Sequence, residues 1–226
     1  MSLVVAIRFK GGVVLAGDSR ETGPEGRYRD DARKVFKLTE HIAVGCAGNT
    51  ALYEEIMVRL EKRLADRQEM FLSNAIVEIT EVAQDTHSRF AKMHGDKDPF
   101  LRNPVEAILI GYEAEGQPAP VIIGCTTKSS YEPKEARKDR PLAVMGEPRH
   151  VKHILRWCAD GELSREQAMF LSALAIVETA RTTNIVGGPI RVLLIENGVV
   201  SEADDAQAKK ALEDAGKVNW KRLLLS

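Results

Sequence analysis

The order of helical and extended segments constrains the fold of this chain more than any other feature of its sequence. Apolar residues at helical spacing predict helices in consecutive pairs, 49–70 with 74–95 and 148–159 with 164–179, and one last helix over 203–214. β-rich runs lie around these pairs, over 3–10, 13–16, 34–38, 41–46, 105–112, 121–125, 142–145, 190–195 and 199–200. Because the helices do not alternate with single strands, a doubly wound parallel sheet is disfavoured. We expect an α+β chain of two stacked antiparallel sheets with a helix pair outside each sheet.

Local turn and cap residues set the expected ends of these elements. Gly11-Gly12 and Asn197-Gly198 are hairpin turns between neighbouring strands. The polar stretch 19–31 is predicted to be a loop. The expected helix boundaries are N-caps at Asn49 and Asn74, an end at Gly95, and a capping box of Ser164 with Gln167.

Size and charge indicate an ordinary soluble globular protein. With 226 residues and a formal net charge of −1, we expect a single domain over 1–226 that binds neither nucleic acid nor a membrane surface. No apolar run approaches the roughly 20 residues of a membrane span, and no signal peptide is recognisable. The three cysteines, Cys46, Cys125 and Cys158, suit a reducing cytoplasm and lack metal-ligand spacing.

Motifs for bound cofactors or metals are absent from the sequence. Neither Gly11-Gly12 nor Gly187-Gly188 has the spacing of a phosphate-binding loop, and there is no GxSxG or HExxH motif. The helical histidines, His87, His94, His150 and His153, are expected to be solvated or structural. We therefore expect no cofactor and no metal.

The N-terminus is the first candidate for chemistry. Ser2 follows Met1 directly, and a small second residue generally allows the initiator methionine to be removed. Ser2 would then carry both a hydroxyl and a free α-amine. An α-amine has a pKa of about 7.7–8, so roughly a third of it is neutral near pH 7.5, whereas a lysine is neutral only to about one part in a thousand. The amine is therefore the better base for the hydroxyl, unless a lysine is strongly shifted.

Two charged residues at strand ends are the next candidates. Asp18 follows the second strand in LAGDSR, and Lys34 begins the third in RKVFKL. A lysine beside Ser2 would lower the pKa of its amine and stabilise negative charge, and Asp18 could hold that lysine in place. The alternative is a structural ion pair, or two charges that face solvent.

A turn rich in small residues completes the set. In GCAGNT a strand runs into a helix, so the free N–H groups at the start of that helix could bind an oxyanion. A tight turn needed only for the chain path is equally compatible with these residues.

Together these stretches resemble the proteasome β-subunit family of N-terminal nucleophile hydrolases, which includes the HslV-type and Anbu proteins. That family has an N-terminal threonine, an Ala-(Ala/Gly)-Asp motif, a lysine sixteen residues later and an Ala-Gly pair before the first long helix. Ser2, Asp18, Lys34 and Ala47-Gly48 match in one register without a gap. The resemblance is close over about 2–65, and it implies a four-layer αββα sandwich throughout.

The resemblance implies a role for each matching residue. Ser2 would be the nucleophile with its amine as base, Asp18 and Lys34 would support it, and the Gly48 N–H would polarise the scissile carbonyl. Positions that shape the pocket for the residue before the cut would be Glu21, Ala32, Cys46, Thr50 and Glu54.

The chain departs from the family pattern in three places. Serine replaces threonine, Met145-Gly146-Glu147-Pro148 replaces a Ser-Gly motif, and Thr183 and Val186 replace an aspartate and a serine before Gly187-Gly188. These differences concern groups that orient the amine rather than the fold.

We therefore expect a cytoplasmic hydrolase that cleaves an amide, in the first instance a peptide bond, through an acyl-enzyme on Ser2. The resemblance also implies a homo-oligomeric ring, whereas the sequence identifies no unfoldase partner. Two alternatives stay open. One is an amidohydrolase or transferase acting on a non-peptide substrate, and the other is a non-catalytic assembly subunit in which Asp18 and Lys34 form a structural pair.

Overall fold

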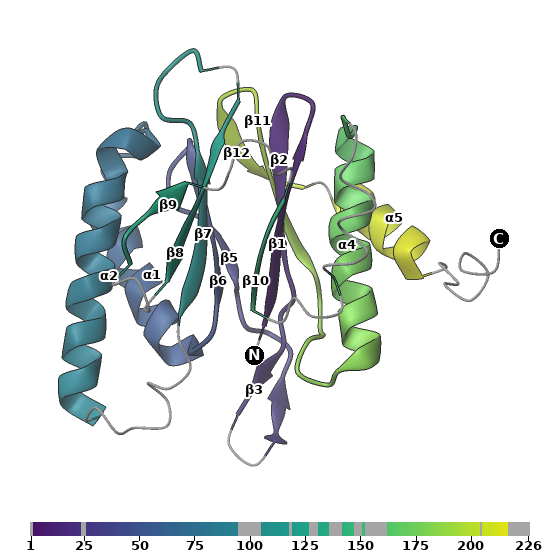
Figure 1. Cartoon of the computed structure of the whole chain (residues 1–226), viewed down its shortest axis with the longest axis horizontal. Helices are drawn as coiled ribbons and strands as arrows, with labels where there is room; N and C mark the ends of the chain where they lie inside the picture. The colour runs from purple at the N-terminus through teal and green to yellow at the C-terminus, as the bar shows by residue number, and fades with distance from the viewer. Residues whose placement is uncertain are drawn as a thin grey trace.

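Two five-stranded antiparallel sheets stack face to face between helices, as Figure 1 shows. The computed structural model describes residues 2–23, 26–94, 105–117, 119–126, 131–135, 142–146, 151, 162–203 and 205–216. The first sheet has the strand order β10 (Leu142–Gly146), β1 (Leu3–Phe9), β2 (Gly12–Gly17), β11 (Arg191–Glu196) and β12 (Val199–Glu202). The second has the order β5 (Val35–Lys37), β6 (Ile42–Ala47), β7 (Glu106–Gly111), β8 (Val121–Thr126) and β9 (Lys134–Glu135).

Helices cover the outer face of each sheet. α1 (Thr50–Leu64) and α2 (Leu72–His94) pack outside the second sheet, and α4 (Arg165–Thr182) and α5 (Asp205–Gly216) pack outside the first. The predicted α+β architecture of two stacked sheets with outer helices is therefore confirmed. None of the described helices combines the length and the apolar character needed to cross a membrane.

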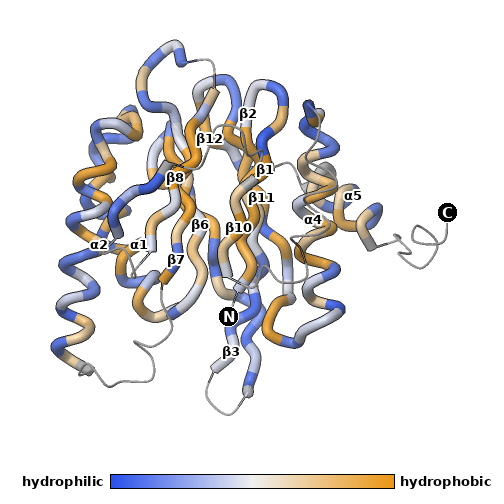
Figure 2. The backbone as a smooth tube through the Cα atoms, in the orientation of Figure 1, coloured by the Kyte–Doolittle hydropathy of each residue, from blue (hydrophilic) through white to orange (hydrophobic). Residues whose placement is uncertain are grey.

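Strand β1 shows why the sheets are buried on both faces. Leu3, Val5 and Ile7 pack towards α4 and α5, whereas Val4 and Ala6 pack between the two sheets. Because successive strand residues point to opposite faces, a strand covered on both sides must be apolar throughout. Figure 2 accordingly shows hydrophobic colour along the strands of both sheets.

The helix caps were predicted more accurately than the helix ends. Asn49 caps α1 through its side chain, which accepts a hydrogen bond from Leu52 N at 3.1 Å. The capping box of Ser164 with Gln167 is present at α4, which continues to Thr182 rather than Thr179. The last helix lies two residues later than expected, at Asp205–Gly216.

The predicted boundary between α1 and α2 was wrong. α1 ends at Leu64 rather than near Met70, and α2 begins at Leu72, before the expected cap at Asn74. The connecting residues bond to the sheets instead of continuing the helix. Glu40 N donates to Gln68 O, Thr39 Oγ1 donates to Met70 O, and Leu72 N donates to Tyr112 O.

The stretch 19–31 was also predicted wrongly, because it contains a short hairpin. β3 (Glu21–Thr22) pairs with β4 (Tyr28–Arg29), and Gly23 N donates to Arg27 O at 2.8 Å. A cross-strand ion pair of Arg29 with Glu21 at 3.1 Å stabilises a segment with little apolar content. The predicted end at Gly95, and the predicted helix over 148–159 apart from Val151, lie outside the described residues.

Close contact between the sheets depends on a glycine. A Cβ atom on Gly45 of β6 would lie 2.5 Å from Val4 Cγ1 and 3.1 Å from Leu15 Cδ1, both in the first sheet. Gly45→Ala should therefore lower the free energy of unfolding by about 1–3 kcal/mol, as overpacking of a dense core does. Urea denaturation measures this change. Gly23→Ala is the matched control, since its Cβ would meet only Arg27 O at 3.6 Å, and equal losses in the two variants would contradict the packing argument.

Candidate functional site

A buried ion pair lies at the end of the sandwich where the chain begins. Asp18 directly follows β2, and Lys34 directly precedes β5. Lys34 Nζ lies 2.8 Å from Asp18 Oδ1, and both side chains are 0% exposed. The ammonium also donates to the carbonyl oxygen of Arg20 at 2.5 Å. The two residues predicted to act together therefore form a direct, dehydrated pair that joins the two sheets.

The Asp18 carboxylate accepts hydrogen bonds from three further donors. Leu3 N donates to Oδ1 at 2.9 Å, and Arg20 N and Gly187 N each donate to Oδ2 at 3.1 Å. These bonds offset the cost of burying the charge, since an unpaired buried carboxylate would be strongly destabilising. They also tie the start of β1 to the loop before β11, and so fix the position of the residue that precedes Leu3.

Ser2 lies beside this pair. Leu3 N and Lys34 Nζ contact the same carboxylate oxygen, and Ser2 is bonded to Leu3 N through its carbonyl carbon. Ser2 is only 3% exposed. On its other side, a Cβ atom on Gly146 would lie 1.8 Å from Ser2 O, so only glycine fits there, with a φ of 94°. Ser2 and Lys34 thus occupy the same end of the molecule.

Burial changes the proton affinity of the lysine. Desolvation is the largest influence and lowers the pKa of Lys34, while the negative charges of Asp18, Glu21 and Asp30 partly oppose it. The net effect is a pKa below the ordinary value of lysine. This ammonium is therefore a concentrated positive charge in a low-dielectric setting, where it acts more strongly on its neighbours than a solvated lysine would.

The turn with small residues lies across from Ser2. β6 ends at Ala47, Gly48 follows with a φ of 109°, and Asn49 then caps α1. Cys46 N donates to Lys34 O at 2.8 Å, which fixes this turn against the lysine strand. A Cβ on Gly146 would also lie 3.4 Å from Ala47 Cβ, so Gly146 separates Ser2 from the turn. The four residues predicted to form the catalytic group are brought to one place.

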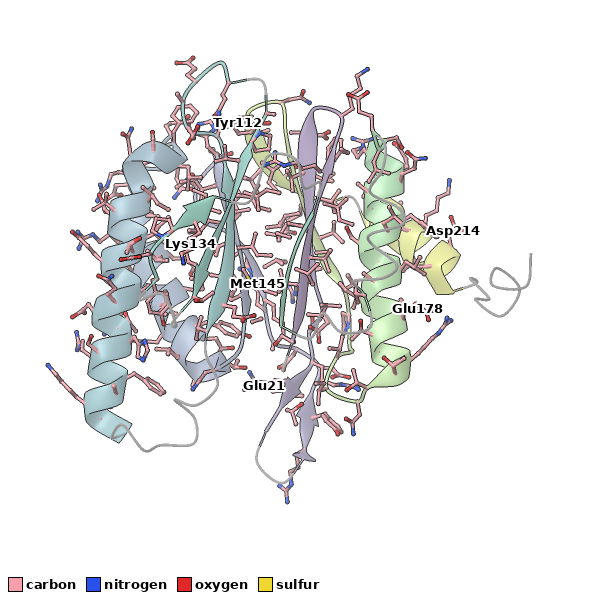
Figure 3. The ribbon with its side chains drawn as sticks, in the orientation of Figure 1. Glu21, Tyr112, Lys134, Met145, Glu178 and Asp214 are labelled. Carbon is pink, nitrogen blue, oxygen red and sulfur yellow. The ribbon has the colours of Figure 1, made fainter. Side chains whose placement is uncertain are left out.

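The residues predicted to shape a pocket include two charged residues and two buried ones. Glu21 on β3 and Glu54 on α1 share one partner, Arg29, at 3.1 and 3.7 Å. Burial, together with the neighbouring Glu21, raises the pKa of the Glu54 carboxyl. Figure 3 shows Glu21 at the end of the sandwich where the N-terminus lies. Thr50 is the first residue of α1, on the same side as Glu54.

The two buried residues of this set are Ala32 and Cys46, each 1% exposed. Cys46 packs into the core between the second sheet and α1, where it lines a cavity of about 30 Å³ together with Tyr53 and Tyr131. Burial raises the pKa of the Cys46 thiol to about 12. This cysteine is therefore not a nucleophile at neutral pH. Within the described residues, no three His, Cys, Asp or Glu side chains are arranged to hold a metal ion.

Comparison with known families places this arrangement in context. A family model described as "Proteasome subunit" matches residues 2–195. The chain belongs to the proteasome subunit family. Proteasome subunit beta of Acidothermus cellulolyticus is 41% identical over 54 residues, which are 24% of this chain and 19% of that protein. Proteasome subunit beta of Streptomyces griseus is 47% identical over 57 residues, 25% of this chain and 20% of that one. The matched part thus spans about a fifth of these curated relatives.

Solved structures similar to this proteasome-family chain share its fold over nearly the whole length. Anbu (ancestral beta-subunit) from Yersinia bercovieri has a TM-score of 0.75 at 20% identity, covering 99% of this chain and 94% of that one. Anbu from Pseudomonas aeruginosa, solved as a helical assembly, has a TM-score of 0.74 at 22% identity, covering 98% and 93%. The αββα sandwich fold implied by the resemblance is therefore confirmed.

Two of the positions that depart from the family pattern make contacts within this chain. The Thr183 hydroxyl accepts a bond from Ile185 N at 3.3 Å, and Val186 is fully buried in the core beneath α4. The loop that contains these two residues reaches Asp18 through the backbone N–H of Gly187. Glu147 lies outside the described residues.

Sequence reasoning missed the backbone groups that hold the ion pair. The signal for the Gly187 contact was present in the Gly187-Gly188 doublet. A Cβ on Gly187 would lie 2.8 Å from Arg20 Cζ, and one on Gly188 would lie 2.9 Å from Asp30 Cβ. Arg20 and Asp30 form a two-pronged ion pair over these glycines, with both N–O distances at 2.7 Å. The doublet thus allows the loop to approach this pair closely.

Removal of the Asp18 charge should test how far the site supports the fold. Asp18→Asn leaves Lys34 buried without a counter-charge and puts an amide among four donors. We expect a loss of about 3–5 kcal/mol in the free energy of unfolding, as for other broken buried pairs. Asp30→Asn is the control, because it breaks an ion pair whose carboxylate side chain is 41% exposed. Urea denaturation of both variants should show a clear loss only for Asp18→Asn, and two similar curves would exclude a structural role for the buried pair.

Proposed function

We propose that this chain is an N-terminal nucleophile hydrolase that cleaves peptide bonds through an acyl-enzyme on Ser2, after removal of Met1. The observation that carries the proposal is the buried Lys34 ammonium, which shares Asp18 Oδ1 with the amide that immediately follows Ser2. Membership of the proteasome subunit family supports the same chemistry.

In the proposed first step, the Ser2 hydroxyl oxygen attacks the scissile carbonyl carbon, and its proton passes to the free α-amine of the same residue. The Lys34 charge lowers the pKa of that amine and so keeps more of it neutral. Negative charge on the carbonyl oxygen is stabilised by the N–H of Gly48, at the turn that faces Ser2.

The second half of the proposed cycle restores the enzyme. The protonated α-amine gives its proton to the leaving nitrogen as the peptide bond breaks, which leaves an ester on Ser2. Water then attacks the ester carbon while the amine takes a proton from it. The bond between this carbon and Ser2 Oγ breaks, Oγ regains a proton from the amine, and the acid product leaves. No cofactor or metal takes part in this proposal.

We further propose that the functional unit is a homo-oligomer of copies of this chain. Supporting this proposal, the Anbu protein of Pseudomonas aeruginosa forms a helical assembly. A ring or a helical assembly of identical chains repeats one head-to-tail contact between two different surfaces of the chain.

Intact-mass measurement tests the nucleophile directly. The purified chain should lack the mass of Met1 and should gain one adduct with a serine-reactive peptide electrophile. Ser2→Ala should abolish the adduct with little change in thermal stability, and Lys34→Met should reduce it at least a hundredfold because the supporting charge is lost. Lys37→Met is the matched control on the same strand, since Lys37 pairs with Glu40 at a partly exposed position. A chain that keeps Met1 and forms no adduct would favour a non-catalytic subunit, and an adduct on Ser2→Ala would identify another nucleophile.

The pH dependence of adduct formation follows from the two amines. Below the pKa of the α-amine, about 7.7–8 in an isolated group and lower beside Lys34, the base is protonated and the rate falls. Lys34 carries its charge only below its own pKa, which burial lowers from the ordinary value. We expect a bell-shaped dependence of the rate on pH. On the alkaline side, the rate should begin to fall at a pH below ~10.4, which is the ordinary pKa of lysine. A rate that stays constant up to that pH would contradict an electrostatic role for Lys34.

A further inference from the structure

One carboxylate near the site takes no part in the proposed mechanism. Glu106 is the first residue of β7, in the second sheet, and lies opposite Ala47 in the antiparallel register. Its Oε2 accepts a hydrogen bond at 2.9 Å from Gly146 N, the last amide of β10 in the first sheet. The bond therefore joins the two sheets at the end that contains Ser2. Because the acceptor is an ionisable carboxylate, the bond is stronger than one between neutral groups.

The partner of this carboxylate occupies a critical position. Gly146 pairs with Leu3 across β10 and β1, and a Cβ atom on it would meet Ser2 O at 1.8 Å and Ala47 Cβ at 3.4 Å. Gly146 is thus a spacer between the proposed nucleophile and the turn that contains Gly48. A shift of Gly146 would change the separation of these two groups.

The strand that contains Gly146 lies at the edge of the first sheet as far as the structure describes the chain. Among the described strands, β10 pairs within its sheet only with β1. Towards the second sheet, the side chain of Met145 lies close to Gly124 of β8. A Cβ atom on Gly124 would lie 3.2 Å from Met145 Cε. Figure 3 shows Met145 in the region between the sheets. The Glu106 bond is a polar contact that holds the end of this strand against the second sheet.

We infer that Glu106 is a positioning residue, which holds Gly146 so that Ser2 and the Gly48 turn keep their reactive separation. This inference rests on the proposed function. The carboxylate touches neither reacting group and acts through the backbone of β10. Displacements of about 1 Å in a reactive geometry can cost on the order of a hundredfold in rate, so a residue of this kind can control the rate without contacting substrate.

Two variants separate the bond from the charge. Glu106→Leu removes the acceptor, whereas Glu106→Gln keeps an acceptor oxygen for Gly146 N. With a serine-reactive peptide electrophile, we expect Glu106→Leu to lower the saturating rate of adduct formation about tenfold to a hundredfold, with the half-saturating concentration changed less than about twofold. Glu106→Gln should restore the rate to within about threefold of the unsubstituted chain. If Glu106→Leu does not fold, Glu106→Ala replaces it.

Hydrogen exchange at the Gly146 amide gives a readout that does not require catalysis. We expect exchange to accelerate about tenfold in Glu106→Leu and to stay near the original rate in Glu106→Gln. Glu196→Leu is the matched control. Glu196 is a half-buried strand carboxylate bound by Arg165 at 3.1 Å, and it pairs with Gly12 at the opposite end of β2. Neither its adduct rate nor the exchange of Gly146 should change.

The outcomes distinguish the two proposals. If the unsubstituted chain forms no adduct, the proposed function is wrong, and the expected effect of Glu106 on the rate is wrong with it. Hydrogen exchange at Gly146 still shows in that case whether Glu106 holds the strand. Faster exchange with an unchanged adduct rate would overturn the positioning role and leave Glu106 as a strand support only. Unchanged exchange in Glu106→Leu would overturn the inference altogether.

Discussion

The buried pair of Asp18 with Lys34 is the interaction on which the N-terminal end of the molecule depends. Both side chains are fully removed from solvent, so each charge is tolerable only because the other lies 2.8 Å away. The cost of dehydration is further offset by backbone N–H groups from three separate segments, at Leu3, Arg20 and Gly187. One carboxylate therefore fixes the relative positions of β1, β2, β5 and the loop before β11.

The remaining constraint is the close approach of the two sheets. Gly45 allows β6 to contact Val4 and Leu15, and Gly146 allows β10 to contact Ser2 and Ala47. Dense interiors transmit small displacements rather than absorbing them. The ion pair and these two glycines therefore work together, because the carboxylate fixes the start of β1 and the glycines fix the distance to the opposite sheet.

Local signals in the sequence were enough to predict the architecture and part of the site. The first helix pair, the hairpin turns, the Asn49 cap and the Ser164 capping box all depend on residues close in sequence, and all are present. The spacing of Asp18 and Lys34 matched a family register, and the two residues do meet. By contrast, the Glu106–Gly146 and Asp18–Gly187 bonds join residues 40 and 169 positions apart. No local pattern identifies the partners of such contacts, although the Gly187-Gly188 doublet indicates a close approach of the chain there. The Arg29–Glu21 pair, which stabilises the hairpin in the polar stretch, was likewise not predicted.

Under the proposed function, the long-range contacts around Ser2 also compensate for having serine where the family pattern has threonine. A β-branched side chain has few rotamers because two heavy atoms crowd its Cβ, and serine lacks that restriction. Rigidity at Ser2 must then come from its surroundings. Leu3 N bound to Asp18 holds the backbone on one side, and Gly146 held by Glu106 encloses it on the other. A nucleophile with a less restricted side chain is thus compatible with a fixed attack geometry, because the main chain around it is fixed from both sheets.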